Sequence, residues 1–240
     1  FRTAWDCDSL SAFGGVVGFS DMVDGEVAKD LTQKFVEVLV APDYEAKALE
    51  ILDKKKDLRI IKIESLEKPL LDDGFEYRSV QGGILVQQRF QSKIDSEVNL
   101  EAVSKRQPEK RDMDAAIFNW AVLPFVDSNA IVIGDENKTL GIGSGQRSRI
   151  YSARLAVYYA NTQSKDPTGT KGKVMVSDAF FPQRDCIDLA GICGIRAIVC
   201  PLGSINDDKI IQAVNEYAMV MLVTRTFPGD RTLCERAFSH

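Results

Sequence analysis

The chain has 240 residues, of which 45% are hydrophobic and 27% are charged, and its formal net charge at pH 7 is −5. A chain of this length buries a substantial core as one large or two small domains, and its acidic balance argues against a protein that coats nucleic acid. We therefore expect no nucleic-acid partner. No apolar run approaches the ~20 residues that cross a bilayer and no secretory signal opens the chain, so we also expect no membrane partner.

Strand and helix patterns alternate over the first 63 residues. Predicted strands lie at residues 14–19, 35–40 and 58–63. Apolar residues at helical spacing predict helices at residues 24–34 and 44–55, and Asp43 is the predicted cap of the second helix. This order of elements is typical of an α/β layer structure.

The middle of the chain holds the predicted boundary between two parts. Residues 64–77 are polar and rich in turn formers, which predicts a loop, and a strand entered through two glycines follows at 82–88. Residues 92–112 are strongly charged, and we interpret them as a solvated linker that leads into a helix. We therefore expect one domain in residues 1–104 and another in residues 105–240.

The α/β alternation returns in the second half of the chain. Predicted helices lie at residues 113–122, 148–162, 187–193 and 205–217. Predicted strands lie at residues 130–133, 139–142, 173–176, 196–200 and 219–223. No clear sequence repeat relates the two halves, although the shared alternation allows a common fold.

Five cysteines are spread along the chain without a C-x-x-C pair, and the one histidine is His240. An odd number of widely spaced cysteines favours reduced thiols in a cytoplasmic protein over a disulfide framework. Cys186, Cys193 and Cys200 repeat every seven residues, whereas zinc-binding cysteines normally stand two to four residues apart. We interpret them as small buried hydrophobic residues and expect no metal site built from them.

The segment from Ser177 to Asp185 is the most informative stretch of the sequence. Two adjacent aromatic residues, a proline and two carboxylates follow directly on an apolar strand-like run, Lys173–Val176. An interior strand has no use for that mixture, whereas a strand that ends in exposed aromatic and charged groups commonly forms the wall of a pocket. We therefore expect a binding site at this edge of the sheet.

A glycine-rich segment at residues 141–149 lies between a predicted strand and a predicted helix. Its three glycines would let the backbone approach a ligand closely, the helix N-terminus favours anions, and Arg149 adds a bidentate donor for phosphate or carboxylate. The segment lacks the Gly-Lys-Ser/Thr end of a P-loop and does not match G-x-G-x-x-G. Spacing alone leaves a structural turn and an anion site as equal alternatives.

Three further polar loops have both a structural and a functional interpretation. Asn129 lies between a predicted helix and a predicted strand, where it can close an Asx turn or hydrogen-bond a planar amide. Asp8 lies beside two hydroxyl groups and a glycine turn, and Ser204 precedes a predicted helix, so capping explains both by default. Taken one at a time, these loops favour the structural interpretation.

Taken together, the motifs resemble those of one family in their order and spacing. The segments are Asp8–Gly15, Phe35–Pro42, Lys54–Lys56, Gly82–Gly83, Lys105–Pro108, Ser128–Ala130, Gly141–Arg149, Ser177–Pro182 and Pro201–Ser204. The chain resembles the C-terminal part of the aminoimidazole carboxamide ribonucleotide (AICAR) formyltransferase domain of the bifunctional purine biosynthesis enzyme. The resemblance runs from Trp5 to His240.

This resemblance implies a cytoplasmic one-carbon transferase. The 5-amino group of the AICAR nucleotide would take the formyl group of 10-formyltetrahydrofolate, which leaves tetrahydrofolate. The implied fold is a pair of cytidine-deaminase-like α/β subdomains without zinc. The implied assembly is a homodimer in which each active site draws residues from both subunits, with a monovalent cation near Asp178 and the C-terminus.

The resemblance also assigns roles to single residues. Asn129 matches the asparagine beside the nucleotide's carboxamide and the formyl group, and it is the implied catalytic residue. The implied nucleotide-binding residues are Asp8, Asn129, Arg149, Phe180 and Arg236, with Arg225 as the alternative to the last. The implied folate-binding residues are Ile150, Asp185, Ser204 and Ile205.

Two departures from the family's pattern leave a second hypothesis open. The family's catalytic Lys-His pair lies upstream of the Asp8 motif and does not occur in this sequence, so we expect an upstream segment to supply it. Many bacterial members have lysine where this chain has Asp127, which changes the charge near a phosphate site. The second hypothesis is a catalytically inactive remnant or a regulatory module that binds nucleotide and folate.

Overall fold

The computed structural model describes residues 1–63, 75–88 and 100–224. The chain forms two compact units, the first from residues 1–5 and 9–91 and the second from residues 6–8 and 92–240. Helices and strands are mixed in both, which confirms the predicted α/β class. The assignment of residues 1–104 and 105–240 to two cytidine-deaminase-like subdomains stays a prediction.

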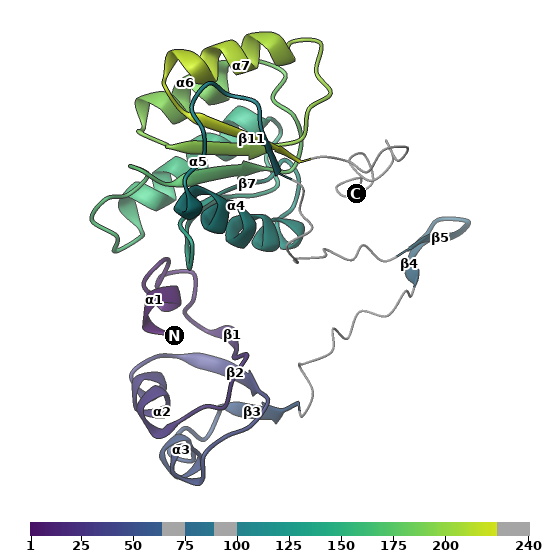
Figure 1. Cartoon of the computed structure of the whole chain (residues 1–240). Coiled ribbons are helices and arrows are strands. Elements are labelled where there is room, and N and C mark those ends of the chain that lie inside the picture. The colour runs from purple at the N-terminus through teal and green to yellow at the C-terminus, as the bar shows by residue number, and fades with distance from the viewer. Residues whose placement is uncertain (64–74, 89–99, 225–240) are drawn as a thin grey trace. The chain divides into compact units, whose positions relative to one another are not determined.

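The first unit contains a three-stranded parallel sheet in the order β1-β2-β3. Its elements are α1 (Arg2–Trp5), β1 (Gly15–Gly18), α2 (Gly25–Thr32), β2 (Val36–Ala41), α3 (Ala46–Leu52) and β3 (Arg59–Lys62). Leu31 of α2 and Leu52 of α3 are buried in one cluster with Leu39 of β2. The two helices therefore cover the sheet through its central strand (Figure 1).

The start of α3 differs from the prediction. The helix begins at Ala46, because Tyr44 is buried and its hydroxyl donates to the carbonyl oxygens of Leu39 (3.1 Å) and Ile61 (3.0 Å). Asp43 does not cap the helix, since its carboxylate accepts from the backbone N–H of Tyr44 instead. A tyrosine that reaches two strands overrides the local helical spacing.

A two-stranded hairpin lies between the parts of the chain that the structure leaves undescribed. Its strands are β4 (Phe75–Val80) and β5 (Gly83–Gln88), which pair antiparallel. The second strand confirms the prediction, but the predicted loop at 64–77 is wrong at its end, where β4 begins. Phe75 and Tyr77 lie on one face of the paired strand, and Glu76 and Arg78 lie on the other. Because the charged residues alternate with the aromatic ones, the composition of the segment suggests a polar loop.

The second unit is built around a six-stranded mixed sheet in the order β6-β11-β10-β9-β7-β8. Its elements are β6 (Leu100–Ala102), α4 (Lys110–Val122), the 3-10 turn η1 (Leu123–Phe125), β7 (Ile131–Gly134), β8 (Thr139–Gly143), α5 (Arg149–Thr162), β9 (Val174–Ser177), α6 (Asp185–Ile192), β10 (Ala197–Cys200), α7 (Asp207–Glu216) and β11 (Val220–Thr224). Among the described residues, no helix is both long and apolar enough to span a membrane.

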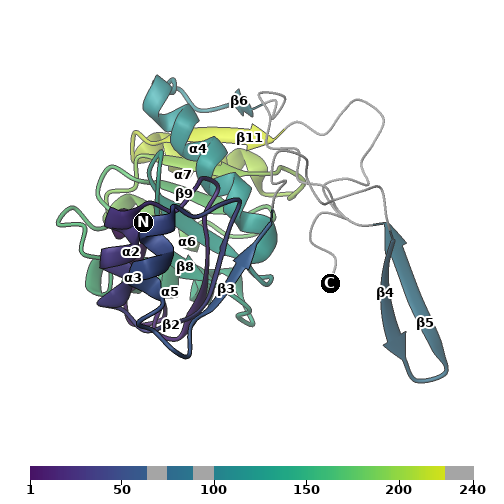
Figure 2. The same ribbon diagram turned by 90° about the horizontal axis from the view of Figure 1, so that it is seen from below.

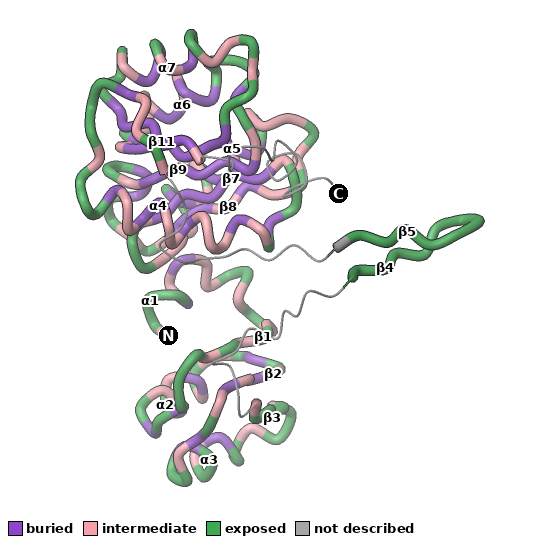
Figure 3. Tube along the Cα trace, turned by 45° about the vertical axis from the view of Figure 1, so that its right-hand side comes forward, coloured by how far each residue is buried: buried purple, intermediate pink, exposed green. Residues whose placement is uncertain are grey.

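Helices cover both faces of this sheet. Met175 and Ile198 point into a core shared with α5, α6 and α7, whereas Val174, Val176 and Val199 point into a core shared with α4. Figure 1 shows α6 and α7 on one side of the sheet and α4 on the other. The central strands form a continuous buried layer in Figure 3, as expected for strands that are covered on both faces.

Strand β6 is the main element of the second unit that the sequence did not predict. It pairs antiparallel with β11 at the edge of the sheet, with Ala102 opposite Leu222 (Figure 2). Its three residues lie within the charged segment 92–112, which we had interpreted as a linker. A strand this short has no period of its own, so only its partner β11 defines it.

Helix α5 lies unusually close to strand β8. A Cβ atom at Gly141 would overlap the carbonyl oxygen of Ala156, and one at Gly143 would overlap that of Ser152. Real Cβ atoms do not approach backbone this closely, so both positions require glycine. The glycines thus fix the distance between the sheet and the helix that begins with Arg149.

Gly143→Ala should lower the free energy of unfolding by about 2 kcal/mol or more, because the new methyl group forces α5 away from β8. Urea unfolding followed by circular dichroism measures the change. Gly18→Ala in β1 is the control, since a Cβ there meets nothing within 4 Å and the change should be neutral or stabilise by up to about 1 kcal/mol. Equal stability of Gly143→Ala and wild type would contradict the close packing.

Candidate functional site

Four loops of the second unit meet where strands β8, β9 and β10 end and β7 begins. This end of the sheet is called its site edge, and the other end of the same strands is the opposite edge. Register pairs Ile131 with both Gly143 and Ser177, so the start of β7 and the ends of β8 and β9 lie side by side. Strand β10 runs parallel to β9, so its end at Cys200 lies at the same edge. The sequence-predicted residues Asn129, Arg149, Phe180 and Ser204 all stand in or directly beside these four loops.

Arg149, the first residue of α5, is the centre of the hydrogen-bond network at this edge. Its Nη1 donates to the carboxylate of Asp178 and to Oγ of Ser177 (3.1 Å), and its Nη2 donates to Oδ1 of Asn129 (3.1 Å). The side chain is 10% exposed and that of Asp178 is fully buried. The Ser128 hydroxyl donates to the second carboxylate oxygen of Asp178. The guanidinium and the carboxylate therefore form a nearly buried ion pair.

Hydrogen bonds fix both the side-chain amide and the backbone carbonyl of Asn129. Its Nδ2 donates to the carbonyl oxygen of Gln146 (2.7 Å) while Oδ1 accepts from Arg149. Its backbone carbonyl accepts from the buried hydroxyl of Ser152 in the first turn of α5 (2.6 Å). Nδ2 carries two N–H groups, and Gln146 accepts from one of them. Within the described part of the chain, the other N–H is available to bind a ligand. The amide is partly exposed at the sheet edge, with a fixed orientation.

The described contacts of the glycine-rich segment are structural. Gly141 and Gly143 are buried within β8 and serve helix packing. Gly145 alone lies in the turn with a positive φ of 64°, and its N–H donates to the carbonyl of Asp127 (2.8 Å). Of the two alternatives, the described contacts support the structural turn. Arg149 stands at its end, with its charge compensated by Asp178.

The segment after β9 presents one aromatic ring outward and buries the next. Phe180 is 38% exposed, whereas Phe181 is 1% exposed and packs in the core. A Cβ at Gly203 would lie 3.6 Å from the Phe180 ring, so the loop after β10 passes beside that ring. Ile205 in the same loop is fully exposed, and the Asn206 side chain donates to the carbonyl of Pro182 (3.0 Å). These contacts join the two loops into one partly apolar surface.

Asp185 and Ile150 flank this surface on helices. Asp185 is exposed and opens α6, two residues earlier than the sequence predicted, and its carboxylate accepts from the backbone N–H of Cys186. Ile150 is partly buried against the core below α5. Ser204 does not cap α7; Asn206 is the cap residue, and Ser204 instead accepts from the N–H of Asn206.

The cysteine thiols give this edge no nucleophile. Burial raises the pKa of Cys186 to about 12, and the nearby Asp185 raises it further against the opposing effect of Arg149. A thiol with such a pKa stays protonated at neutral pH and reacts slowly. Cys186 and Cys200 are buried, which confirms the expectation for these two residues, whereas Cys193 is only partly buried. Among the described residues, no three His, Cys, Asp or Glu side chains gather as metal ligands.

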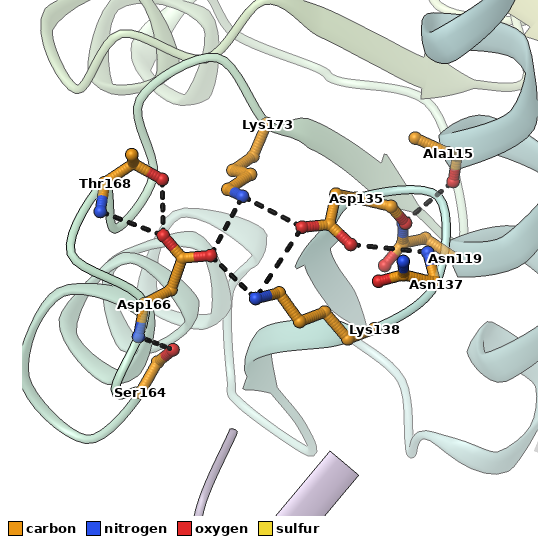
Figure 4. A network of polar contacts seen from close by, with 9 residues as sticks. All are labelled: Ala115, Asn119, Asp135, Asn137, Lys138, Ser164, Asp166, Thr168 and Lys173. Carbon is orange, nitrogen blue, oxygen red and sulfur yellow. Dashed lines mark hydrogen bonds and ion pairs between the residues drawn. The ribbon is translucent and has the colours of Figure 1, made fainter. Parts of the chain in front are cut away.

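A second polar cluster lies at the opposite edge of the sheet, where Asp135 follows β7 and Lys138 precedes β8. Lys138 and Lys173 both contact Asp166 (2.8 and 3.1 Å), and Lys173 also contacts Asp135 (2.9 Å). Figure 4 shows the two lysines between the two carboxylates, with Thr168 donating to Asp166. Opposite charges alternate in this cluster, so it is electrically balanced and anchors the loop between α5 and β9.

This second cluster also holds the segment that carries Asp8. Lys165 donates to Asp6 from its side chain (2.5 Å) and from its backbone (3.1 Å). Burial raises the pKa of the neighbouring Cys7, on which the charges of Lys138 and Asp135 also act. Asp8 therefore follows residues that are fixed at the opposite edge of the sheet. The contacts of these neighbouring residues do not bring Asp8 to Asn129 and Arg149 of the same chain. Arg236 and its alternative Arg225 lie outside the described residues.

Comparisons with known proteins now decide the family. The model of the family described as AICARFT/IMPCHase bienzyme matches residues 1–159. The chain is 44% identical over 225 residues to the bifunctional purine biosynthesis protein PurH of Persephonella marina, and 43% identical over 241 residues to that of Wigglesworthia glossinidia brevipalpis. The corresponding protein of Aquifex aeolicus is 42% identical over 224 residues.

The chain belongs to the AICARFT/IMPCHase bienzyme family. The matches cover 93%, 100% and 93% of this chain but 42% of the length of each of these three relatives. The resemblance inferred from the motifs is thus confirmed at the level of the family.

In this AICARFT/IMPCHase chain, sequence reasoning missed the partners of Arg149. Ser177 and Asp178 belong to the motif Ser177–Pro182, but the motif does not indicate which cation the carboxylate of Asp178 contacts. The available signal was physical: a carboxylate directly after a short, mostly apolar strand tends to be buried, and a buried carboxylate needs a positive partner. The partner stands 29 residues earlier in the sequence, beyond the reach of any local pattern.

The second cluster predicts how stability depends on pH. Burial alone would raise the pKa of Asp166, but hydrogen bonds from Lys138, Thr168 and Lys173 outweigh burial and lower it. A lowered pKa in the folded state stabilises the protein above the unfolded value of about 3.9, and this contribution is lost as the pH falls toward the folded value.

Asp166→Asn should therefore cost about 2 kcal/mol of unfolding free energy at pH 7, and the difference from wild type should shrink below about pH 4. Urea unfolding between pH 7 and pH 3 measures it. Asp53→Asn removes a pair that is 78% and 82% exposed, so it should have an effect of at most about 1 kcal/mol. A deficit that stays constant down to pH 3 would refute the electrostatic explanation.

Proposed function

We propose that this chain is part of an AICAR formyltransferase of purine biosynthesis. The 5-amino group of the nucleotide attacks the formyl carbon of 10-formyltetrahydrofolate, the bond from that carbon to N10 breaks, and tetrahydrofolate leaves. Membership of the AICARFT/IMPCHase family supports the reaction class. The observation that carries the proposal to particular atoms is the fixed amide of Asn129 at the sheet edge.

Formyl transfer places two demands on a site. The amine is a weak nucleophile because its lone pair is delocalised into the imidazole ring, so it must be positioned against the formyl carbon. Its attack produces an oxyanion, which an oriented N–H donor stabilises. Asn129 offers such a donor, since Nδ2 uses one N–H for Gln146 and retains the other.

Proton removal from the amine needs a base, and neither Asp178 nor Cys186 can serve as one. The carboxylate of Asp178 is buried and engaged by Arg149 and Ser128, and the Cys186 thiol is protonated because of its raised pKa. The proposal therefore assigns the base to the Lys-His pair that the resemblance places upstream of Asp8. Asn129 is the catalytic residue that this chain itself contributes.

The partly apolar surface beside Phe180 suits the two ligands. The exposed face of Phe180 can stack on the planar base of the nucleotide, and the fully exposed Ile205 offers an apolar contact to the folate. Asp185 is exposed and carries a carboxylate that can accept hydrogen bonds from the N–H groups of a pterin. Ser204 and Ile150 complete the proposed folate site, and Asp8 and Arg236 the proposed nucleotide site.

A homodimer with shared active sites is part of the proposal. The neighbours of Asp8 are fixed at the edge of the sheet opposite to Asn129 and Arg149, about 20 Å away along α5. A site that combined Asp8 from one copy with Asn129 from another would account for this separation. The setting that this chemistry requires is the cytoplasm.

A monovalent cation at Asp178 fits the described residues poorly. Both carboxylate oxygens of Asp178 already accept hydrogen bonds, and the Arg149 guanidinium compensates its charge. A second cation would have to share the carboxylate with that guanidinium and would be repelled by its charge. We therefore derive no step of the reaction from such an ion.

The direct test is a formyl-transfer assay on the protein in its complete natural form. With AICAR and 10-formyltetrahydrofolate it should release tetrahydrofolate, and Asn129→Ala should lower kcat by about 10²- to 10³-fold. Asn137→Ala is the matched control, because Asn137 is exposed in the turn at the opposite edge. If the wild-type protein binds AICAR but shows no turnover, the second hypothesis of a non-catalytic binding module is correct.

Asp185→Ala should weaken folate binding about tenfold, since a hydrogen bond to a charged group contributes about 1.5–3 kcal/mol. Isothermal titration with tetrahydrofolate measures the change, and AICAR affinity should stay the same. Asp208→Ala, an exposed carboxylate in the first turn of α7, is the control. Unchanged folate affinity of Asp185→Ala would show that the proposed folate site is misplaced.

A further inference from the structure

We propose that Asp178 is a positioning residue for formyl transfer, which acts on Asn129 through Arg149. The inference rests on the proposed function and adds to it a residue that touches neither substrate. Asp178 orients the guanidinium, and the guanidinium orients the catalytic amide.

Burial limits what Asp178 can do. Its side chain is fully buried, and Arg149 and Ser128 occupy its two carboxylate oxygens. A buried carboxylate is retained only where it is paired and hydrogen-bonded, and removal of one partner is costly. Since no substrate atom can reach it, its effect on the reaction must pass through its partners.

The planar shape of Arg149 transmits that effect. Its Nη1 is fixed by Asp178 and by Ser177 at 3.1 Å, so the plane of the guanidinium is set on that side. Nη2 lies in the same plane and donates to Oδ1 of Asn129 at 3.1 Å. The planar guanidinium holds its N–H donors in fixed directions. A lysine at this position would supply only one mobile charge and could not orient Asn129 in the same way.

The amide of Asn129 thereby loses its freedom to flip. Oδ1 faces Arg149 and Nδ2 faces the carbonyl of Gln146 at 2.7 Å, so the remaining N–H of Nδ2 has one direction. Without the carboxylate of Asp178, the guanidinium would be drawn to solvent or to the phosphate of the nucleotide. The amide would then rotate, and the donor for the oxyanion would be lost.

The pairing also changes the expected role of Arg149. The resemblance implies a nucleotide-binding arginine, whereas the structure compensates its charge with a buried carboxylate and leaves its side chain 10% exposed. An arginine held in this way contributes direction more than net charge. Loss of Asp178 should therefore lower kcat more than it raises the KM for AICAR.

The test compares two buried ion pairs in the complete natural form of the protein. Asp178→Asn breaks the pair at the site, and Asp112→Asn breaks the pair of Asp112 with Arg196, whose side chains are 2% and 12% exposed. Arg196 precedes β10 and thus lies at the opposite edge. Both variants should unfold at lower urea concentration, but only Asp178→Asn should lower kcat, by on the order of 10- to 100-fold.

A double-mutant cycle shows whether the effect passes through Asn129. In an Asn129→Ala background, Asp178→Asn should lower kcat by less than about threefold further, because the amide that it orients is gone. An undiminished further loss in that background would overturn the inference. So would a wild-type kcat for Asp178→Asn, or an equal fall of kcat for Asp112→Asn.

Two more outcomes are separable. If Asp178→Asn does not fold, Ser128→Ala removes one hydrogen bond of Asp178 but leaves its ion pair with Arg149 in place, so it should destabilise the protein less and lower kcat about threefold. A wild-type kcat for Ser128→Ala would then overturn the inference. If the wild-type protein itself transfers no formyl group, the proposed function fails and the inference fails with it, whereas the other negative results leave the proposed function standing.

Discussion

Helix α5 packs against β8 with the carbonyl oxygens of Ala156 and Ser152 directly over Gly141 and Gly143. The rest of the candidate site depends on this close packing, because α5 begins with Arg149. The helix carries the guanidinium to Asp178 at the end of β9 and the Ser152 hydroxyl to the backbone of Asn129. A displaced helix would move all of these contacts together, so the two glycines determine the geometry of the Asn129 amide.

The two edges of the six-stranded sheet use buried charge in different ways. At the edge with Asp135 and Lys138, two lysines and two carboxylates balance one another and hold a loop. At the edge with Arg149, one guanidinium serves a carboxylate, a hydroxyl and an amide at once. Buried charges need partners at both edges. Only in the second case does an additional donor of the same planar group extend to a partly exposed side chain, which is the arrangement that catalysis can use.

Much of the fold could be predicted from local pattern. Helices α2, α4 and α5 and the buried strands β7, β9, β10 and β11 lie within one to three residues of their predicted bounds, because apolar periodicity and run length define them. The errors occur where a distant partner decides. Tyr44 reaches across to Leu39 and Ile61 and delays α3, and β6 exists because β11 pairs with it. The hairpin strand β4 likewise depends on β5, since its charged residues alternate with its aromatic ones.

The sequence by itself determined the α/β class, most of the elements and, through its motifs, the family. Through the resemblance it also singled out Asn129 and Arg149, which the strand order of the folded sheet brings to one edge. Only the tertiary structure decided which groups these residues contact. It placed Gly141 and Gly143 in the packing of α5, and it joined Arg149 to Asp178 across 29 positions. The physical reason is that periodicity records which face of an element is buried, whereas the partner of a buried charge depends on elements far apart in the sequence.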